Sequence, residues 1–286
     1  MTLLLDTYLA RIGLTAAPPA DAQGLATVQR AHRLAIGFEN LDVMLGRGIR
    51  LDTASLWAKL VTGSARGGYC FEQNGLYGAM LALLGFENRP LLGRVWLGMD
   101  WPGTPQTMPP MTHTFRLATI EGAPWIADAG FGGSFVPPMP LVDGAEAQTP
   151  DGALHRLRRA GAAGEAKGAW LLERAGPASA TDGRAHGHGA FQPQYSFDLD
   201  EVAPIDLELS NHWTCTRPDT RFTSACLASI VLEDGFAALN GRRLSLHTGG
   251  RGEVSEIADA QAWRNVLADL FRVELSGYEV KRLGVF

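Results

Sequence analysis

The spacing of apolar residues predicts that the first third of the chain is helical. Leu4, Tyr8 and Ile12 fall near a helical period, which Gly13 stops. Further helices are expected over residues 24–34, 53–61 and 70–84. The last of these repeats apolar residues on one face, which indicates that the helices pack as a bundle.

The pattern changes after Gly85 to short segments separated by glycine, proline and polar turns, which are typical of β-strands. Strands are expected over 91–99, 114–120, 124–128, 170–174 and 194–199. Residues 175–190 are rich in glycine and alanine, so we expect an exposed loop there. A meander over 225–232, 235–239 and 242–248, followed by a helix over 259–270, completes an α+β chain.

The chain has 286 residues, which is longer than a usual single domain and favours several packed units. We place a helical domain carrying Cys70 at 1–88, a β domain carrying His113 and Asp128 at 89–205, and a smaller α/β domain at 206–286. Apolar residues make up 46% of the sequence, enough to bury a core in each unit.

Charge and cysteine content exclude several classes of protein. The net charge is -5 with no basic patch, so we do not expect a nucleic-acid binder. No segment approaches the roughly 20 apolar residues of a membrane span, and the first residues lack a signal-peptide pattern. The 3 cysteines are too few and odd in number for a secreted disulfide framework. We therefore expect a cytoplasmic protein with free thiols.

The segment around Cys70 carries the features of a cysteine nucleophile. Two glycines, Gly67 and Gly68, permit a tight turn, and Cys70 then falls in the first turn of an expected helix. The partial positive charge of a helix N-terminus favours the nucleophilic thiolate, and Arg66 adds to it. The alternative is that Cys70 is a small buried core residue.

A base and an orienting carboxylate are expected on one hairpin. His113 and Asp128 flank a hairpin turn signal at Glu121-Gly122. With a two-residue turn there, His113 lies opposite Gly130, and Asp128 lies two residues away on the same face, within reach. A thiol nucleophile requires such a pair. Taken singly, His113 could be an exposed strand-end residue and Asp128 a turn residue.

The glycine-rich stretch 130–135 exposes backbone N–H groups that could meet an acyl or phosphate-bearing ligand, although a plain hairpin loop is the alternative. It is not a Walker motif, because no Gly-Lys-Ser/Thr follows. His186 and His188 lack a cysteine or carboxylate at the spacing of a zinc site, so no metal is expected.

Several segments together resemble the arylamine N-acetyltransferase family. They are FENL at 38–41, RGGYCFE at 66–72, DAGFG at 128–132 and NHWTCTRPDTRF at 211–222, in the family's order. The resemblance implies an N-terminal helical bundle, a central antiparallel β-barrel and a C-terminal α/β lid. The core would be similar to that of papain-like cysteine proteases and transglutaminases.

The resemblance also implies an activity, which is ping-pong transfer of acetyl from acetyl-coenzyme A to an arylamine, arylhydrazine or N-hydroxyarylamine. Cys70, His113 and Asp128 match the family's catalytic triad. Other matching positions line the acceptor pocket (Phe38, Phe131 and Trp213) or lie near the coenzyme (Gly132, Gly133, Thr216 and Thr220). No nucleic acid, membrane or metal is implied, and the chain could be a monomer or a homodimer.

Two departures from the family concern substrate preference. Gly133 stands where some relatives carry a basic residue, and Trp213 stands where Phe or Tyr is frequent. Alternatives also stay open: an amide-forming or malonyl-transferring relative, a cysteine hydrolase with the same triad, or a relative that only binds ligands.

Overall fold

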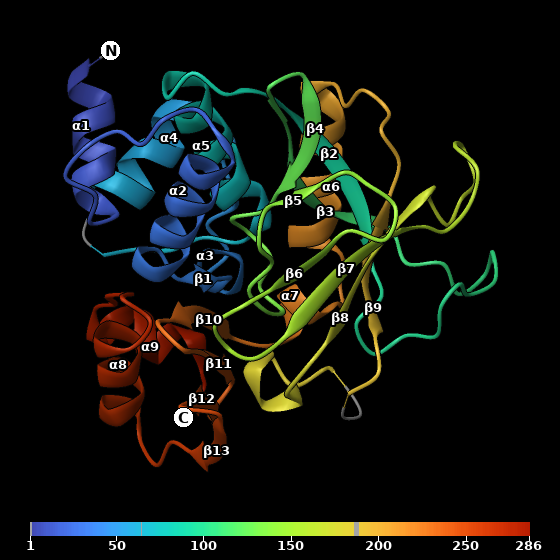
Figure 1. The fold of residues 1–286 in the computed structure, drawn as a ribbon. Helices are drawn as coiled ribbons and strands as arrows, with labels where there is room; N and C mark the ends of the chain where they lie inside the picture. The colour runs from blue at the N-terminus through green and yellow to red at the C-terminus, as the bar shows by residue number, and fades with distance from the viewer. Residues whose placement is uncertain (1, 64, 186–188) are drawn as a thin grey trace.

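The computed structural model describes residues 2–63, 65–185 and 189–286. Helices of the first part of the chain pack beside a large curved sheet, and the C-terminal sheet and helices lie below those helices in the view of Figure 1. The fold is an α+β fold with a helical bundle, an antiparallel β-barrel and a C-terminal α/β unit, as the sequence predicts.

The N-terminal helices begin where polar side chains can cap them. Asp21 accepts a hydrogen bond from the backbone N–H of Gly24 at the start of the second helix, and Asp52 does the same for Ser55 at the start of the fourth. The elements are α1 (Thr2–Arg11), α2 (Ala22–Ala35), β1 (Phe38–Glu39), α3 (Leu41–Met44), α4 (Thr53–Trp57), the π-helical turn η1 (Ala58–Thr62) and α5 (Cys70–Leu83).

Within the described residues, an eight-stranded antiparallel sheet forms the barrel, with the order β5-β4-β3-β2-β9-β8-β7-β6. Its strands are β2 (Glu87–Val95), β3 (Met111–Ile120), β4 (Ala123–Ala127), β5 (Met139–Pro140), β6 (Glu146–Gln148), β7 (Leu154–Arg159), β8 (Trp170–Ala175) and β9 (Gln192–Phe197). A buried cluster that includes Phe115, Leu157, Leu172 and Phe197 fills its interior.

The last part of the chain adds a second antiparallel sheet of five strands among the described residues, in the order β1-β10-β11-β12-β13. Its elements are η2 (Ala178–Ala180), α6 (Pro204–Thr216), α7 (Arg221–Ser224), β10 (Leu227–Leu232), β11 (Gly235–Asn240), β12 (Arg243–Thr248), β13 (Arg251–Glu256), α8 (Ala260–Asp269) and α9 (Gly277–Leu283). Because β1 comes from the helical part, the first and last thirds of the chain share one sheet.

Most of the expected elements are confirmed, and the structure differs from the expectation at several places. The strand expected over 91–99 runs instead from Glu87 to Val95, and the helix α9 was not expected. β7 and β13 were not expected as strands, because their sequences are rich in charged residues. β13 is exposed along its whole length. α6 was not expected as a helix. The expectation of an exposed loop over 175–190 is wrong for residues 178–182, because Ala180 and Thr181 are buried beside the second sheet.

The hydrophobic clusters follow the expected order along the chain, and we propose that they mark units bounded near residues 88 and 205. The helical cluster centres on Leu25, Leu76 and Leu81, and the C-terminal cluster centres on Trp263 and Leu267. None of the helices in the described ranges combines the length and apolar character of a membrane span.

Two fully buried histidines should make the fold sensitive to acid. His32 accepts from the Tyr8 hydroxyl at Nδ1 (2.8 Å) and donates from Nε2 to Gln73 Oε1 (2.6 Å), which is a neutral tautomer. Burial lowers the pKa of His32 to about 3, and burial with the charge of Arg174 lowers the pKa of His155 to about 3. Below pH ~6.5, the unfolded chain therefore binds protons that the folded chain does not.

We expect the free energy of unfolding to fall as pH drops below ~6.5, by up to about 1.4 kcal/mol per pH unit for each histidine. Urea unfolding of wild type and His155→Leu at pH 7.5, 6.0 and 5.0 checks this. The variant should show a shallower pH slope, whatever its absolute stability. Equal slopes for the two proteins would contradict the assignment of a neutral buried His155.

Candidate active site

Cys70 is the first residue of α5 and is almost completely buried. The residue before it, Tyr69, has an extended backbone, and its N–H donates to Glu72 Oε2 (3.1 Å) in the first helical turn. The first backbone N–H groups of a helix have no partner within the helix and create a positive local potential. The fold therefore places the Cys70 thiol at the positive end of α5.

The turn before Cys70 is held against β1. A Cβ atom at Gly67 would lie 2.1 Å from the carbonyl oxygen of Gly37, so only glycine permits this approach. The Gln73 side chain donates to the carbonyls of Gly37 (2.8 Å) and Gly68 (3.2 Å). A side chain of α5 thus clamps the loop that leads into α5.

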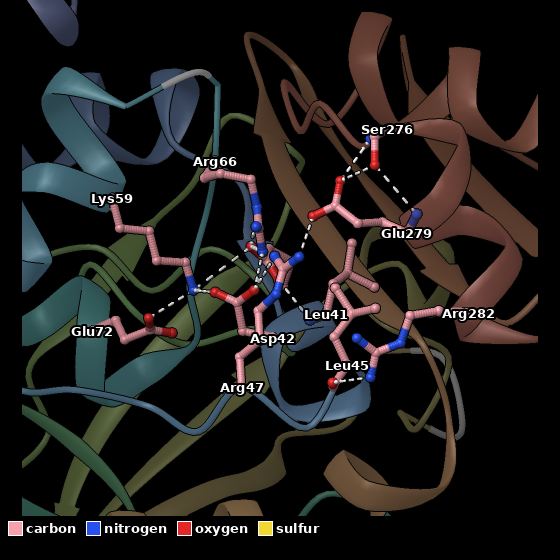
Figure 2. A network of polar contacts seen from close by, with 11 residues as sticks. Leu41, Asp42, Leu45, Arg47, Lys59, Arg66, Glu72, Ser276, Glu279 and Arg282 are labelled. Atoms are coloured by element: carbon pink, nitrogen blue, oxygen red, sulfur yellow. Dashed lines mark hydrogen bonds and ion pairs between the residues drawn. The ribbon is translucent and has the colours of Figure 1, made fainter.

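An ionic cluster lies behind the start of α5 (Figure 2). Arg66 Nη2 lies 2.8 Å from Glu39 Oε1 and 2.9 Å from Asp42 Oδ1. Lys59 Nζ lies 2.7 Å from both Asp42 Oδ2 and Glu72 Oε1. Burial raises the pKa of Glu72 to about 7 in spite of Lys59. The cluster ties the first turn of α5 to β1, α3 and η1.

The same cluster extends to the C-terminal helix. Arg47 contacts Asp42 Oδ1 (3.2 Å) and Glu279 Oε1 (2.6 Å), and Glu279 accepts from the backbone N–H of Ser276 at the start of α9. Figure 2 shows Arg47 and Glu279 pointing toward each other, one from the helical part of the chain and one from the C-terminal part. These charge pairs therefore fix α9, which lies more than 200 positions further along the chain, relative to Cys70.

The hairpin that carries His113 and Asp128 has the predicted register. β3 pairs with β4 so that Ile120 lies opposite Ala123, with Glu121 and Gly122 as a two-residue turn in which both φ angles are positive. His113 Nε2 donates to Asp128 Oδ2 at 2.7 Å, and both side chains are buried. The alternative of an exposed strand-end histidine is wrong.

A β-bulge beside His113 brings the hairpin to the thiol. His113 lies opposite Gly93, but Arg94 lies opposite Met111, so Thr112 is an extra residue in β3. Its carbonyl oxygen lies 3.6 Å from Cys70 Sγ.

Asp128 remains a carboxylate because several donors surround it. Oδ1 accepts from Asn74 Nδ2 (3.0 Å) and from the N–H of Gly130 (2.9 Å), while Oδ2 accepts from His113. Its own N–H donates to Gln29 Oε1 (2.8 Å). Burial alone would raise the pKa of Asp128, but the charge of His113 and these hydrogen bonds lower it below its ordinary value.

His113 is held as the conjugate acid. Burial opposes its charge, but the charge of Asp128, their hydrogen bond and contact with Cys70 raise its pKa well above the usual range. Its ring also packs against Phe131 and Tyr195, with centroids 5.2 and 4.9 Å away. Since Nε2 is bonded to Asp128, Nδ1 is the ring nitrogen left for chemistry at Cys70.

Cys70 and His113 line a cavity of about 290 Å³. Six other predicted positions line it as well: Phe38, Phe131, Gly132, Gly133, Trp213 and Thr220. Asp128 lies behind His113 and does not line the cavity. Thr216 also lies outside the lining; it is exposed, and its hydroxyl donates to the carbonyl of His212 (2.6 Å).

Sequence reasoning missed several residues of this site. Asn74 is four positions after Cys70 on the same helix, a spacing that could have suggested it. Gln29 comes from α2, and no local pattern indicates its contact with Asp128. Asp182 and Arg184, which line the cavity, fell in the segment expected to be an exposed loop.

His186 and His188, the two loop histidines weighed for metal binding, lie outside the described residues. Within the ranges that the structure covers, no group of three or more His, Cys, Asp or Glu side chains could hold a metal ion.

Comparison with known proteins gives consistent results. A family model described as N-acetyltransferase matches residues 21–280. The arylamine N-acetyltransferase of Escherichia coli (strain K12) is 38% identical over 236 residues, covering 82% of this chain and 75% of that protein. The solved structure of arylamine N-acetyltransferase from Salmonella typhimurium has a TM-score of 0.86 at 31% identity and covers 100% of both chains. The Mycobacterium marinum arylamine N-acetyltransferase in complex with CoA has a TM-score of 0.82 at 32% identity and covers 98% of both chains.

Removal of the Asn74 side chain should destabilise the protein strongly. Asn74→Ala leaves buried partners unsatisfied, because Asn74 also accepts from the N–H of Ala129 (3.0 Å) and donates to the carbonyl of Thr114 (2.7 Å). We expect a loss of about 2–4 kcal/mol in urea unfolding. Asn265→Ala on the exposed face of α8 is the matched control and should change stability by less than about 0.5 kcal/mol. Similar small losses in both variants would contradict this role.

Proposed function

Because the chain belongs to the arylamine N-acetyltransferase family, we propose that it transfers acetyl from acetyl-coenzyme A to aromatic amines through a Cys70 thioester. The observation that carries the proposal is that a helix N-terminal cysteine and His113, which is paired with buried Asp128, line one cavity with a largely apolar wall. Each feature alone is compatible with a purely structural role, but together they form the set that covalent acyl transfer requires.

In the first half-reaction, the Cys70 thiolate attacks the thioester carbonyl. The new S–C bond forms at Cys70, and the C–S bond to coenzyme A breaks. The departing thiolate takes the proton of the His113 imidazolium, so that free coenzyme A leaves and a neutral imidazole stays beside the acetyl-enzyme. Backbone N–H groups at the start of α5 stabilise the tetrahedral oxyanion.

In the second half-reaction, the amine attacks the acetyl carbonyl. Nδ1 of neutral His113 takes the proton that the amine loses, and the C–S bond to Cys70 breaks, which restores the thiolate–imidazolium pair. Asp128 keeps the ring oriented throughout and stabilises its charged form. Aromatic amines suit this step because their low basicity leaves them unprotonated near neutral pH.

The cavity wall favours flat acceptors. Phe38 and Phe131 are buried and Trp213 is 38% exposed, and all three line the cavity, where stacking on aromatic rings stabilises flat ligands. We propose arylamines, arylhydrazines and N-hydroxyarylamines as the acceptor class.

The acyl donor would approach along the glycine loop. A relative of similar structure has been solved in complex with CoA. Gly132, Gly133 and Thr220 line the cavity, and we propose that they contact the coenzyme. A Cβ atom at Gly133 would lie 2.5 Å from Leu97 Cδ1, so the loop offers backbone rather than side-chain contacts here. Thr216 could contact only a part of the coenzyme that extends beyond the cavity.

Brief incubation with acetyl-coenzyme A and no amine should add one acetyl group, because the thioester forms in the first half-reaction. Intact-mass and peptide mass spectrometry would locate it on Cys70, and an arylamine should remove it. Cys70→Ala should gain no acetyl group, whereas Cys215→Ala is the matched control and should be acetylated like wild type. Acetylation of Cys70→Ala, or none in wild type with acetyl-, propionyl- or malonyl-coenzyme A, would refute the covalent mechanism.

A further inference from the structure

The cavity wall contains charged side chains that the acetyl-transfer mechanism does not use. Asp182, Arg184 and Arg221 line the same cavity as Cys70 and His113. The N–H of Asp182 donates to the carbonyl of Gly133 (2.9 Å), which fastens this segment to the glycine loop. The backbone at Asp182 is therefore fixed beside the glycine loop.

Asp182 orients both arginines. Its Oδ2 lies 2.7 Å from Arg184 Nη2 and 3.2 Å from Arg221 Nη2, while Oδ1 accepts from the N–H of Arg184 (3.2 Å). The carboxylate is nearly buried, at 6% side-chain exposure, whereas the guanidinium side chains are 29% and 26% exposed. Asp182 is thus enclosed, and each arginine keeps an accessible edge.

The charges around Asp182 do not balance. Two guanidinium groups share a single carboxylate oxygen, which leaves a surplus of positive charge. Among the described residues that line the cavity, the other ionisable side chains are Cys70 and His113, which pair with each other and with Asp128. Burial and the charge of Arg184 lower the pKa of Arg221 in spite of Asp182, as expected for crowded cations.

We propose that Arg184 and Arg221 form an anion-recognition site, positioned by Asp182, that binds a negatively charged group of a substrate bound in the cavity. This inference rests on the proposed function. Guanidinium groups bind carboxylates and phosphates through directed, charge-assisted hydrogen bonds. Much of the surrounding wall is apolar, including Phe38, Phe131 and Leu97. An anion that enters the cavity therefore meets few polar groups other than the two arginines.

Two sources could supply the anion, one in each half-reaction. The donor carries phosphates on coenzyme A, and an acceptor can carry a carboxylate on its aromatic ring. Because the half-reactions are separate, each source can be tested alone. Acetyl-coenzyme A is compared with S-acetyl-N-acetylcysteamine, a neutral thioester. 4-Aminobenzoate is compared with its neutral ethyl ester, using enzyme acetylated beforehand.

The variants are Arg184→Gln and Arg221→Gln, with Arg251→Gln on the exposed edge strand β13 as the matched control. We expect the preference for the anionic substrate over its neutral partner to fall by about tenfold to a hundredfold in at least one pair. Arg221→Lys keeps the charge and should recover part of the preference. The control should keep the wild-type preference in both pairs.

The location of the loss identifies the anion. A loss confined to acetyl-coenzyme A assigns the site to phosphate, a loss confined to 4-aminobenzoate assigns it to carboxylate, and a loss in both shows that the site serves both. Unchanged preferences in both pairs would overturn the proposal.

Calorimetric binding of coenzyme A and 4-aminobenzoate gives a readout that needs no turnover. In one outcome, wild type forms no acetyl-enzyme, while the arginine variants bind coenzyme A or 4-aminobenzoate more weakly than wild type does. In that case the site stands and the proposed function fails. If transfer proceeds and neither affinity nor preference changes, the proposed function stands and the site fails.

Discussion

The buried negative charge of Asp128 is the constraint on which the rest of the site depends. A carboxylate removed from water costs several kcal/mol unless donors replace the water. Here the donors come from different parts of the chain: His113 from β3, Asn74 from α5 and the N–H of Gly130 from the glycine loop. The helical bundle and the barrel must therefore pack correctly before the charge is satisfied, so folding and assembly of the candidate site are one event.

The thiol side of the site is positioned by a different set of interactions. Gln73 clamps the loop before Cys70, and the ionic cluster around Arg66 and Lys59 holds the first turn of α5 from behind. These contacts act through the backbone, which leaves the Cys70 side chain facing the cavity. Removing one charge from such a cluster leaves its buried partner uncompensated, so its members are expected to be intolerant of substitution.

Sequence signals were sufficient to predict features that depend on residues close together in the chain. The Glu121-Gly122 turn sets the register of the hairpin, so the approach of His113 to Asp128 could be predicted without the structure. The glycines before Cys70 and the apolar period of α5 likewise indicated a cysteine at a helix start. The contact of Gln29 with Asp128 and the burial of Asp182 arise only when distant segments pack, and no pattern near either residue encodes them. The family resemblance supplied the acetyl donor and acceptor, which spacing alone does not indicate.

The central claim is that Asp128 holds His113 as an imidazolium beside Cys70 before any substrate binds. Nitrogen-15 NMR of the histidine rings, recorded as pH is varied, measures this directly. The account predicts that both ring nitrogens of His113 remain protonated at pH 7–8, and that the charge is lost near neutral pH in Asp128→Asn. A wild-type His113 that titrates near pH ~6.5, like an isolated histidine, would contradict the account.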